Sequence, residues 1–255
     1  MVVISDFSMK KAVLLFVYFS SFAACISPVL GQRKISSGRI EVTNALDAKP
    51  DSDAFAIVVD YKVAVDSMMA PVLGESLVGM VVDRPESLLS NWAADVMVEF
   101  SDFENGTKAD LGLVNMGGLR NNMPKGVVRT GDIILISPFN NKLSIVYLKG
   151  SDLLSLFQDI AHVHGEGVSR EVRLVITKDG QLVSAMVGGQ PINPERIYRI
   201  ATLDYLAEGN DKMYALKKAQ KLVVSDLFTR DCMMQSIQRA KVITSQIEGR
   251  ITIKD

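Results

Sequence analysis

The sequence predicts an α+β fold, in which helices pack against mixed sheets. Segments with helical periodicity and β-type segments follow one another without the one-for-one order of a doubly wound parallel sheet. Asp179-Gly180 separates two β-type segments and is a hairpin signal, and hairpins make antiparallel pairs. With 255 residues, of which 48% are hydrophobic, the chain can bury a substantial core in one or two domains.

Residues 1–31 have the order of a secretory signal. Lys10-Lys11 precede an apolar run over 12–19, which is too short to span a bilayer, and small residues follow it. Two cleavage sites compete. Phe22-Ala23-Ala24-Cys25 resembles the lipobox of bacterial lipoproteins, with Cys25 lipidated, whereas Val29-Leu30-Gly31 before Gln32 resembles an ordinary signal-peptidase site. The lipobox is favoured, so we expect an exported chain, periplasmic or membrane-anchored as a lipoprotein at the cell envelope.

The polar segment 32–53 is expected to form a tether or an irregular lead-in, and the domain itself is expected over 54–255. A first helix should begin near residue 53, with an N-cap at Asp51, Ser52 or Asp53, and end before Pro71. Its apolar positions recur at three- and four-residue spacing, at Ala54, Ile57, Val58, Tyr61, Val65 and Met68.

The later elements follow from local patterns. Helices are expected over 86–98, with Trp92 in the core, over 152–163 after a Ser151 cap, and over 226–241 after a Ser225 cap. Strands are expected over 79–82, 110–115, 132–137, 143–149, 171–177, 181–187, 196–202 and 250–253. Residues 126–129 fit a short strand or a turn, 205–211 a loop, and 212–218 a short helical turn.

The composition indicates whether the chain binds nucleic acid and whether it can form a disulfide. Lys and Arg total 28 against 29 acidic residues, and no basic cluster is present, which argues against a nucleic-acid partner. Of the two cysteines, Cys25 would be lipidated or removed, so the mature fold is not expected to rely on an intrachain disulfide of Cys232.

The strongest candidate for ligand binding lies within residues 112–141. Gly117-Gly118 follow an apolar strand, and glycines permit positive φ and a close approach of backbone N–H groups to a ligand. Asn115 and Arg120 flank them with an amide and a guanidinium, which suit ribose, phosphate or carboxylate oxygens.

A second part of this stretch is the loop Pro138-Phe139-Asn140-Asn141, where Phe139 would offer a stacking surface at a loop tip. From these residues alone an alternative stays open, in which Gly117-Gly118 form an ordinary turn, Arg120 is solvated and Phe139 fills the core.

Several motifs in one order carry a resemblance to a known family. They are Asn115-x-Gly-Gly-x-Arg120, Gly131-Asp132 leading into Pro138-Phe139-Asn140-Asn141, and the run ATLDYLAEGND over 201–211. Together they resemble the C-terminal domain of 5′-nucleotidases and UDP-sugar hydrolases over roughly residues 71–217. Glu86-x-x-x-x-Asn91 with Asp95 resembles its opening helix, and Glu248-Gly249-Arg250-Ile251 its closing segment.

The resemblance implies a nucleotide- or nucleoside-binding domain with mixed sheets and packed helices. By motif position, Phe139 and Tyr205 would sandwich the base, and Asp211 would accept hydrogen bonds from the ribose. Asn115 and Arg120 would contact the nucleotide. The adjoining loop residues Gly117, Gly118 and Asn141 complete the candidate substrate-binding set.

Three positions depart from the family pattern. Leu88 stands where a polar residue such as asparagine is frequent, so one polar contact is expected to be missing. Gly209-Asn210-Asp211 replaces Gly-Gly-Asp, a turn that survives if Asn210 takes the left-handed conformation that asparagine tolerates. Tyr205 replaces a frequent phenylalanine, which keeps the stacking surface and adds a hydroxyl.

The family's metal-bearing half has no counterpart in these residues. A dinuclear site needs several Asp, His and Asn ligands, and the two histidines, His162 and His164, diverge at i, i+2 spacing near a helix end, as in a solvated helix terminus. No catalytic residue or cofactor is therefore assigned to this chain. We expect it to be the substrate-binding half of a split enzyme of nucleotide catabolism, with the divalent metal pair on a separate metallophosphoesterase chain. A non-catalytic exported nucleotide-binding protein and a degenerate assembly module are the alternatives.

Overall fold

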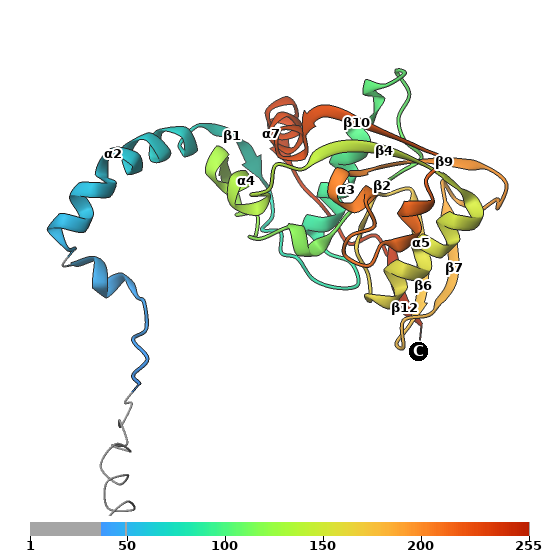
Figure 1. The fold of residues 1–255 in the computed structure, drawn as a ribbon, viewed down its shortest axis with the longest axis horizontal. Helices are drawn as coiled ribbons and strands as arrows, with labels where there is room; N and C mark the ends of the chain where they lie inside the picture. The colour runs from blue at the N-terminus through green and yellow to red at the C-terminus, as the bar shows by residue number, and fades with distance from the viewer. Residues whose placement is uncertain (1–36, 49, 255) are drawn as a thin grey trace, which may run out of the picture. The chain divides into compact units, whose positions relative to one another are not determined.

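The computed structural model describes residues 37–48 and 50–254 (Figure 1). Cys25 and the predicted signal lie outside the described residues. The described residues up to Phe55 form one unit, with a short 3₁₀ helix η1 (Asn44–Ala48), and those from Ala56 form a second unit that holds the sheets. Within 37–48 and 50–254, no helix has both the length and the apolar character of a membrane span.

Helix α2 (Ser52–Met69) is the first helix that the spacing predicts, and it is confirmed. Asp51 is its cap, because its Oδ1 accepts the N–H groups of Asp53 and Ala54 at 3.0 and 2.9 Å. The helix ends two residues before Pro71, as expected. None of the residues of α2 is buried.

A five-stranded sheet forms the centre of the second unit. Its strand order is β10 (Lys221–Phe228), β4 (Lys142–Lys149), β9 (Ile197–Leu203), β2 (Leu111–Val114) and β5 (Gly167–Val168). Strand β2 runs parallel to β9, whereas the pairs β10–β4, β4–β9 and β2–β5 are antiparallel. This mixture confirms the predicted α+β class with mixed sheets.

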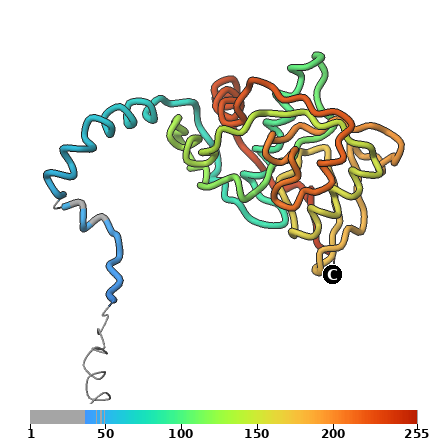
Figure 2. Tube along the Cα trace, in the orientation of Figure 1, coloured from blue at the N-terminus to red at the C-terminus, as the bar shows by residue number. Residues whose placement is uncertain are grey.

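Two smaller sheets flank the central one. The first has the order β11 (Val242–Ile243), β1 (Val72–Ser76), β3 (Gly126–Arg129), and the second has the order β12 (Ile251–Lys254), β6 (Val172–Thr177), β7 (Leu182–Val187), β8 (Gln190–Pro191). Strands β6 and β7 form the predicted hairpin, with Gly180 at φ 80° in its turn. Figure 2 shows the C-terminal strand, in red, beside the yellow chain of β6, to which it is parallel.

Three helices supply most of the helical part of the core. They are α3 (Leu88–Glu99), which packs on β2, α5 (Gly150–His162), and α7 (Thr229–Ala240), which packs on β1. Ser87 caps α3, because its Oγ accepts the N–H of Ser90. Trp92 is 7% exposed, which confirms its place in the core.

The expected strand over 132–137 is wrong, because residues 132–136 belong to helix α4 (Thr130–Ile136) and Ser137 is its C-cap. Asp132 starts the helix by accepting the N–H of Arg129 at 2.7 Å. Ile133 and Ile136 are buried and Leu135 is exposed, which is the spacing of a helix. A run of four apolar residues fits a strand and a buried helical turn equally well. The Asp132 cap favours the helix at this position.

The expected helix over 226–241 begins too early, because residues 226–228 are the end of β10 and the helix begins at Thr229. Ser225 is not a helix cap. It lies in β10, and its Oγ donates to the carbonyl of Leu143 at 2.7 Å across the sheet. Ser151 is not a cap either, since α5 begins at Gly150.

Other boundaries also differ from expectation. Within 79–82 only Met80 pairs, in an isolated bridge to Met123, and the expected loop over 205–211 starts inside helix α6 (Asp204–Ala207). The strands β1, β5, β8, β10 and β11 have no counterpart among the expected strands. The strands over 126–129 and 250–253 and the helical turn η4 (Tyr214–Lys218) match the sequence patterns.

Candidate functional site

The register of the central sheet brings three predicted site loops to one edge. Leu111 of β2 pairs with Ile200 of the parallel β9, and Leu143 of β4 pairs with Leu203 of the antiparallel β9. The carboxyl ends of β2 and β9 and the start of β4 therefore lie at the same edge. Asn115 follows β2, Tyr205 follows β9, and Phe139 precedes β4.

Asp211 is the centre of a hydrogen-bonded cluster at this edge. Asn115 Nδ2 donates to Asp211 Oδ2 at 2.5 Å, and the Tyr205 hydroxyl donates to Asp211 Oδ1 at 2.9 Å. The bond from Tyr205 to the carboxylate raises the pKa of the phenol. Three residues named from motif positions are thus joined directly, although Asn115 and Asp211 are 96 residues apart in the chain.

The turn that presents Asp211 is built differently from the expectation. The left-handed conformations fall on Gly209, Asp211 and Lys212, with φ of 77°, 50° and 67°, and not on Asn210. Asn210 instead closes the turn, because its Nδ2 donates to the carbonyl of Tyr205 at 2.8 Å. A glycine is therefore not needed at position 210.

Gly117 and Gly118 do not take the positive φ that glycine permits. They belong to the 3₁₀ helix η3 (Met116–Gly118), and neither has a φ in the left-handed region. Gly118 instead leaves room for the Asn115 side chain, since a Cβ built on it would lie 2.7 Å from Asn115 Oδ1. A Cβ on Gly117 would approach Asp211 Oδ2 at 4.0 Å.

Arg120 connects the Gly-Gly segment to the loop of Phe139. Its Nη1 donates to the carbonyl of Gly117 at 3.1 Å, and its backbone N–H donates to the carbonyl of Ile136 at 2.8 Å, three residues before Phe139. The residue is otherwise exposed, so its guanidinium retains donors for an anionic ligand.

The two aromatic residues are accessible at the sheet edge. Phe139 is 45% exposed and Tyr205 is 40% exposed, so Phe139 is not a core residue. Asn140 and Asn141 bond to the start of α7, where Asn140 Oδ1 accepts from Arg230 and the Asn141 carbonyl accepts from Thr229. Asn141 is thus near the predicted site in the chain but bonds away from the Asp211 cluster.

Sequence reasoning missed two charged residues of this edge, Glu166 and Arg84. Glu166 directly precedes β5, and Gly167 pairs with Val114, so its side chain enters beside the end of β2. The carboxylate is 4% exposed; it accepts the N–H of Met116 and, at 2.9 Å, a bond from Arg84 Nη2. In the sequence Glu166 stands between two glycines, and nothing in that pattern indicates that its carboxylate is buried.

The pKa of Glu166 is raised above its ordinary value. Burial is the main cause, the nearby carboxylate of Asp211 adds to it, and the Met116 N–H and Arg84 oppose it. Glu166 and Asp211 are therefore two acidic groups of one site with very different exposure to solvent.

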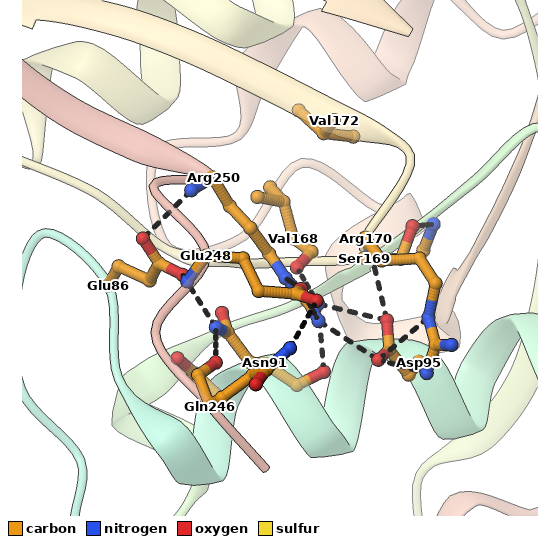
Figure 3. A network of polar contacts seen from close by, with 12 residues as sticks. Glu86, Asn91, Asp95, Val168, Ser169, Arg170, Val172, Gln246, Glu248 and Arg250 are labelled. Carbon is orange, nitrogen blue, oxygen red and sulfur yellow. Dashed lines mark hydrogen bonds and ion pairs between the residues drawn. The ribbon is translucent and has the colours of Figure 1, made fainter. Parts of the chain in front are cut away.

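Other predicted motif residues form a separate network that holds the fold together (Figure 3). Arg250, 3% exposed, donates to Asp95 Oδ1 at 2.9 Å and to Oδ2 at 3.0 Å, and it also bonds to Glu248. Glu86 accepts from Asn91 and from the backbone N–H groups of 248 and 250. These contacts tie α3 to β12. A groove of about 670 Å³ beside the network includes none of the Asp211 cluster among its lining residues.

The two histidines lie outside both clusters. His162 ends α5 and His164 follows with φ 60°, and both are exposed. Among residues 37–48 and 50–254, no group of three or more His, Cys, Asp or Glu side chains is placed to hold a metal ion.

The fold is an α+β domain that carries aromatic, amide and carboxylate side chains at one edge of a mixed sheet. The family model of the 5′-nucleotidase C-terminal domain matches residues 72–218. The chain belongs to this family, and the resemblance drawn from the motifs is confirmed.

Similar proteins are much longer than this chain. Over 186 residues it is 28% identical to Endonuclease YhcR of Bacillus subtilis, covering 70% of this chain and 15% of that protein. Over 167 residues it is 30% identical to an apyrase of Tabanus yao, and the match covers 58% of this chain and 30% of that protein. The structure of a 5′-nucleotidase precursor from Thermus thermophilus has a TM-score of 0.71 and 26% identity, covering 81% of this chain and 44% of that one.

Proposed function

We propose that this chain binds the nucleoside part of a nucleotide at the Asp211 edge and acts as the substrate-binding half of a 5′-nucleotidase-type hydrolase. The observation that carries the proposal is the Asp211 carboxylate, held from both sides by Asn115 and Tyr205 at an edge with two accessible aromatic rings. The family membership supports a nucleotide-related ligand.

The chemistry of the site suits a nucleoside. A carboxylate has about four acceptor positions, and the two bonds to Asp211 leave capacity for ribose hydroxyls. Phe139 and Tyr205 offer faces on which a base can stack, and such stacking contributes ~1–3 kcal/mol per base with little regard to base identity. Arg120 supplies an exposed guanidinium for an anionic group.

In this proposal the hydrolytic step belongs to a separate metallophosphoesterase chain that carries a divalent metal pair. The role of the present chain is to orient the nucleoside, because holding a substrate in the reactive geometry removes much of the entropy barrier. Export by the predicted signal, with Cys25 as a lipid anchor, would put this chain at the cell envelope together with that partner.

The test is calorimetric titration of the chain from Gln32 onward with adenosine and AMP, without metal. We expect binding, and Phe139→Ala should weaken it about tenfold or more, the equivalent of losing one stacking contact. Leu135→Ala is the matched control, an exposed apolar side chain on the adjoining helix α4. Absence of binding to both ligands would contradict the function and favour an assembly module.

A second measurement addresses the division between chains. The chain is mixed with a metallophosphoesterase chain and divalent metal, and phosphate release from AMP is followed. We expect hydrolysis of AMP only on mixing. Release by the present chain alone would contradict the split arrangement, and binding with no hydrolysis in any mixture would favour a non-catalytic nucleotide-binding protein.

A further inference from the structure

Glu166 is a buried carboxylate that lies under the predicted ligand loop without belonging to the set that would touch the ligand. It reaches this place from the start of β5 and accepts the backbone N–H of Met116, which is next to Asn115 in the chain. The same carboxylate accepts from Arg84, a residue of the segment between β1 and α3. It therefore joins three separate segments at one point.

The charged groups that face Glu166 are few and lie on different elements. Arg84, whose side chain is 39% exposed, is the cation, and Asp211 after α6 is the second acid that acts on it. Arg84 also points Nη1 at the Met116 sulfur at 3.9 Å. Glu166 and Arg84 thus hold Met116 through both its backbone and its side chain.

We propose that Glu166 is a positioning residue for the nucleoside site, whose ionised carboxylate fixes Met116 and Arg84 and so keeps Asn115 directed at Asp211. The inference rests on the proposed function and extends it. Only the ionised carboxylate can pair with the Arg84 charge while accepting the Met116 N–H with full strength, because protonation removes the charge that assists both bonds.

A pH dependence of binding follows from this geometry. Because burial raises the pKa of Glu166, it takes up a proton at a higher pH than an ordinary glutamate. Nucleoside affinity should be full above that pKa and fall as the pH is lowered through it, since the neutral acid releases Arg84 and loosens the 115–118 segment.

The experiment compares the unaltered chain with Glu166→Gln and with Glu195→Gln. The Glu195 side chain is 79% exposed and lies before the start of β9, whereas the predicted site lies at the other end of that strand. Adenosine affinity is measured by calorimetry from mildly acidic to neutral pH. Adenosine is used because, unlike a phosphate monoester, it does not titrate over this range. We expect Glu166→Gln to bind about tenfold more weakly at neutral pH and to lose the pH dependence that the other two proteins share.

A second measurement needs no ligand. The Met116 amide resonance is followed by nuclear magnetic resonance over the same pH range, and it should show an inflection in the unaltered chain and in Glu195→Gln but none in Glu166→Gln. If adenosine binds and Glu166→Gln keeps the affinity and pH profile of the unaltered chain, the positioning role is overturned. If no nucleoside binds, the proposed function fails, and the Met116 signal still decides whether Glu166 holds the loop.

Discussion

Gly118 lies so close to Asn115 that a Cβ built on the glycine would be 2.7 Å from Asn115 Oδ1 and 3.2 Å from its Cγ. The Asn115 side chain, in turn, is 6% exposed and bonds to Asp211. The glycine is thus required by a neighbouring side chain and not by its own backbone conformation.

Gly118→Ala should therefore displace Asn115 from Asp211 and weaken adenosine binding about tenfold, since the packed edge cannot absorb an added methyl group. Calorimetry measures the affinity. Gly79→Ala is the control, because a Cβ there would approach nothing nearer than the Met123 carbonyl at 3.9 Å. Equal affinities for the two variants would contradict the steric argument.

The hydrogen bond from Tyr205 to Asp211 predicts an altered tyrosine titration. Because the carboxylate holds the phenolic proton and raises the pKa of Tyr205, Asp211→Asn should lower that pKa toward its ordinary value. Phenolate absorbance over alkaline pH measures it, with Asp179→Asn, in the β6–β7 turn, as the control. Identical titration curves for Asp211→Asn and the unaltered chain would show that the bond does not form.

Arg250 is expected to be the residue on which the junction of α3 and β12 depends most. Arg250→Met leaves Glu248 without this cation and Asp95 with Arg170 alone, and loss of one partner of a buried pair costs about 3–5 kcal/mol of unfolding free energy. Urea unfolding measures the change. Lys254→Met, at the exposed end of β12, is the control and should change stability little; comparable losses in both variants would count against the network.

Cys232 should be inert in the folded chain. It is fully buried, and burial together with the charge of Asp231 raises the pKa of its thiol to about 12, so almost no thiolate forms at neutral pH. A thiol reagent should react with the chain from Gln32 onward only after denaturant is added. Rapid reaction of the native chain would mean that the α7 face opens.

Glu166 also predicts that stability depends on pH. Lowering the pH should weaken nucleoside binding but should increase the unfolding free energy. Its pKa in the folded chain is raised above the unfolded value, so the neutral acid is the form that folding favours. The unfolding free energy should fall as the pH rises from the ordinary glutamate pKa to the raised one. Urea titrations at several pH values should show this fall in the unaltered chain and its loss in Glu166→Gln; the same slope in both would assign it to other groups.

Local patterns predicted those elements whose sequence matches one period. The segments of β2, β4, β6, β7 and β9 are short apolar or β-branched runs, and the hairpin at Gly180 has the residues that its turn requires. Patterns failed where the same run of residues fits two periods, and a local cap or a long-range pairing decided between them. Residues 130–136 became a helix through the Asp132 cap, and the strand β10 depends on its pairing with β4.

The sequence by itself determined the family and the loops of the site, because Asn115, Phe139, Tyr205 and Asp211 lie in motifs whose order and spacing are readable along the chain. Only the tertiary structure decided how these loops are held. Glu166 and Met116 are 50 residues apart, and their contact arises because β5 pairs with β2. Burial of a single carboxylate is a property of the packed sheet edge, so no local pattern of residues could have indicated it.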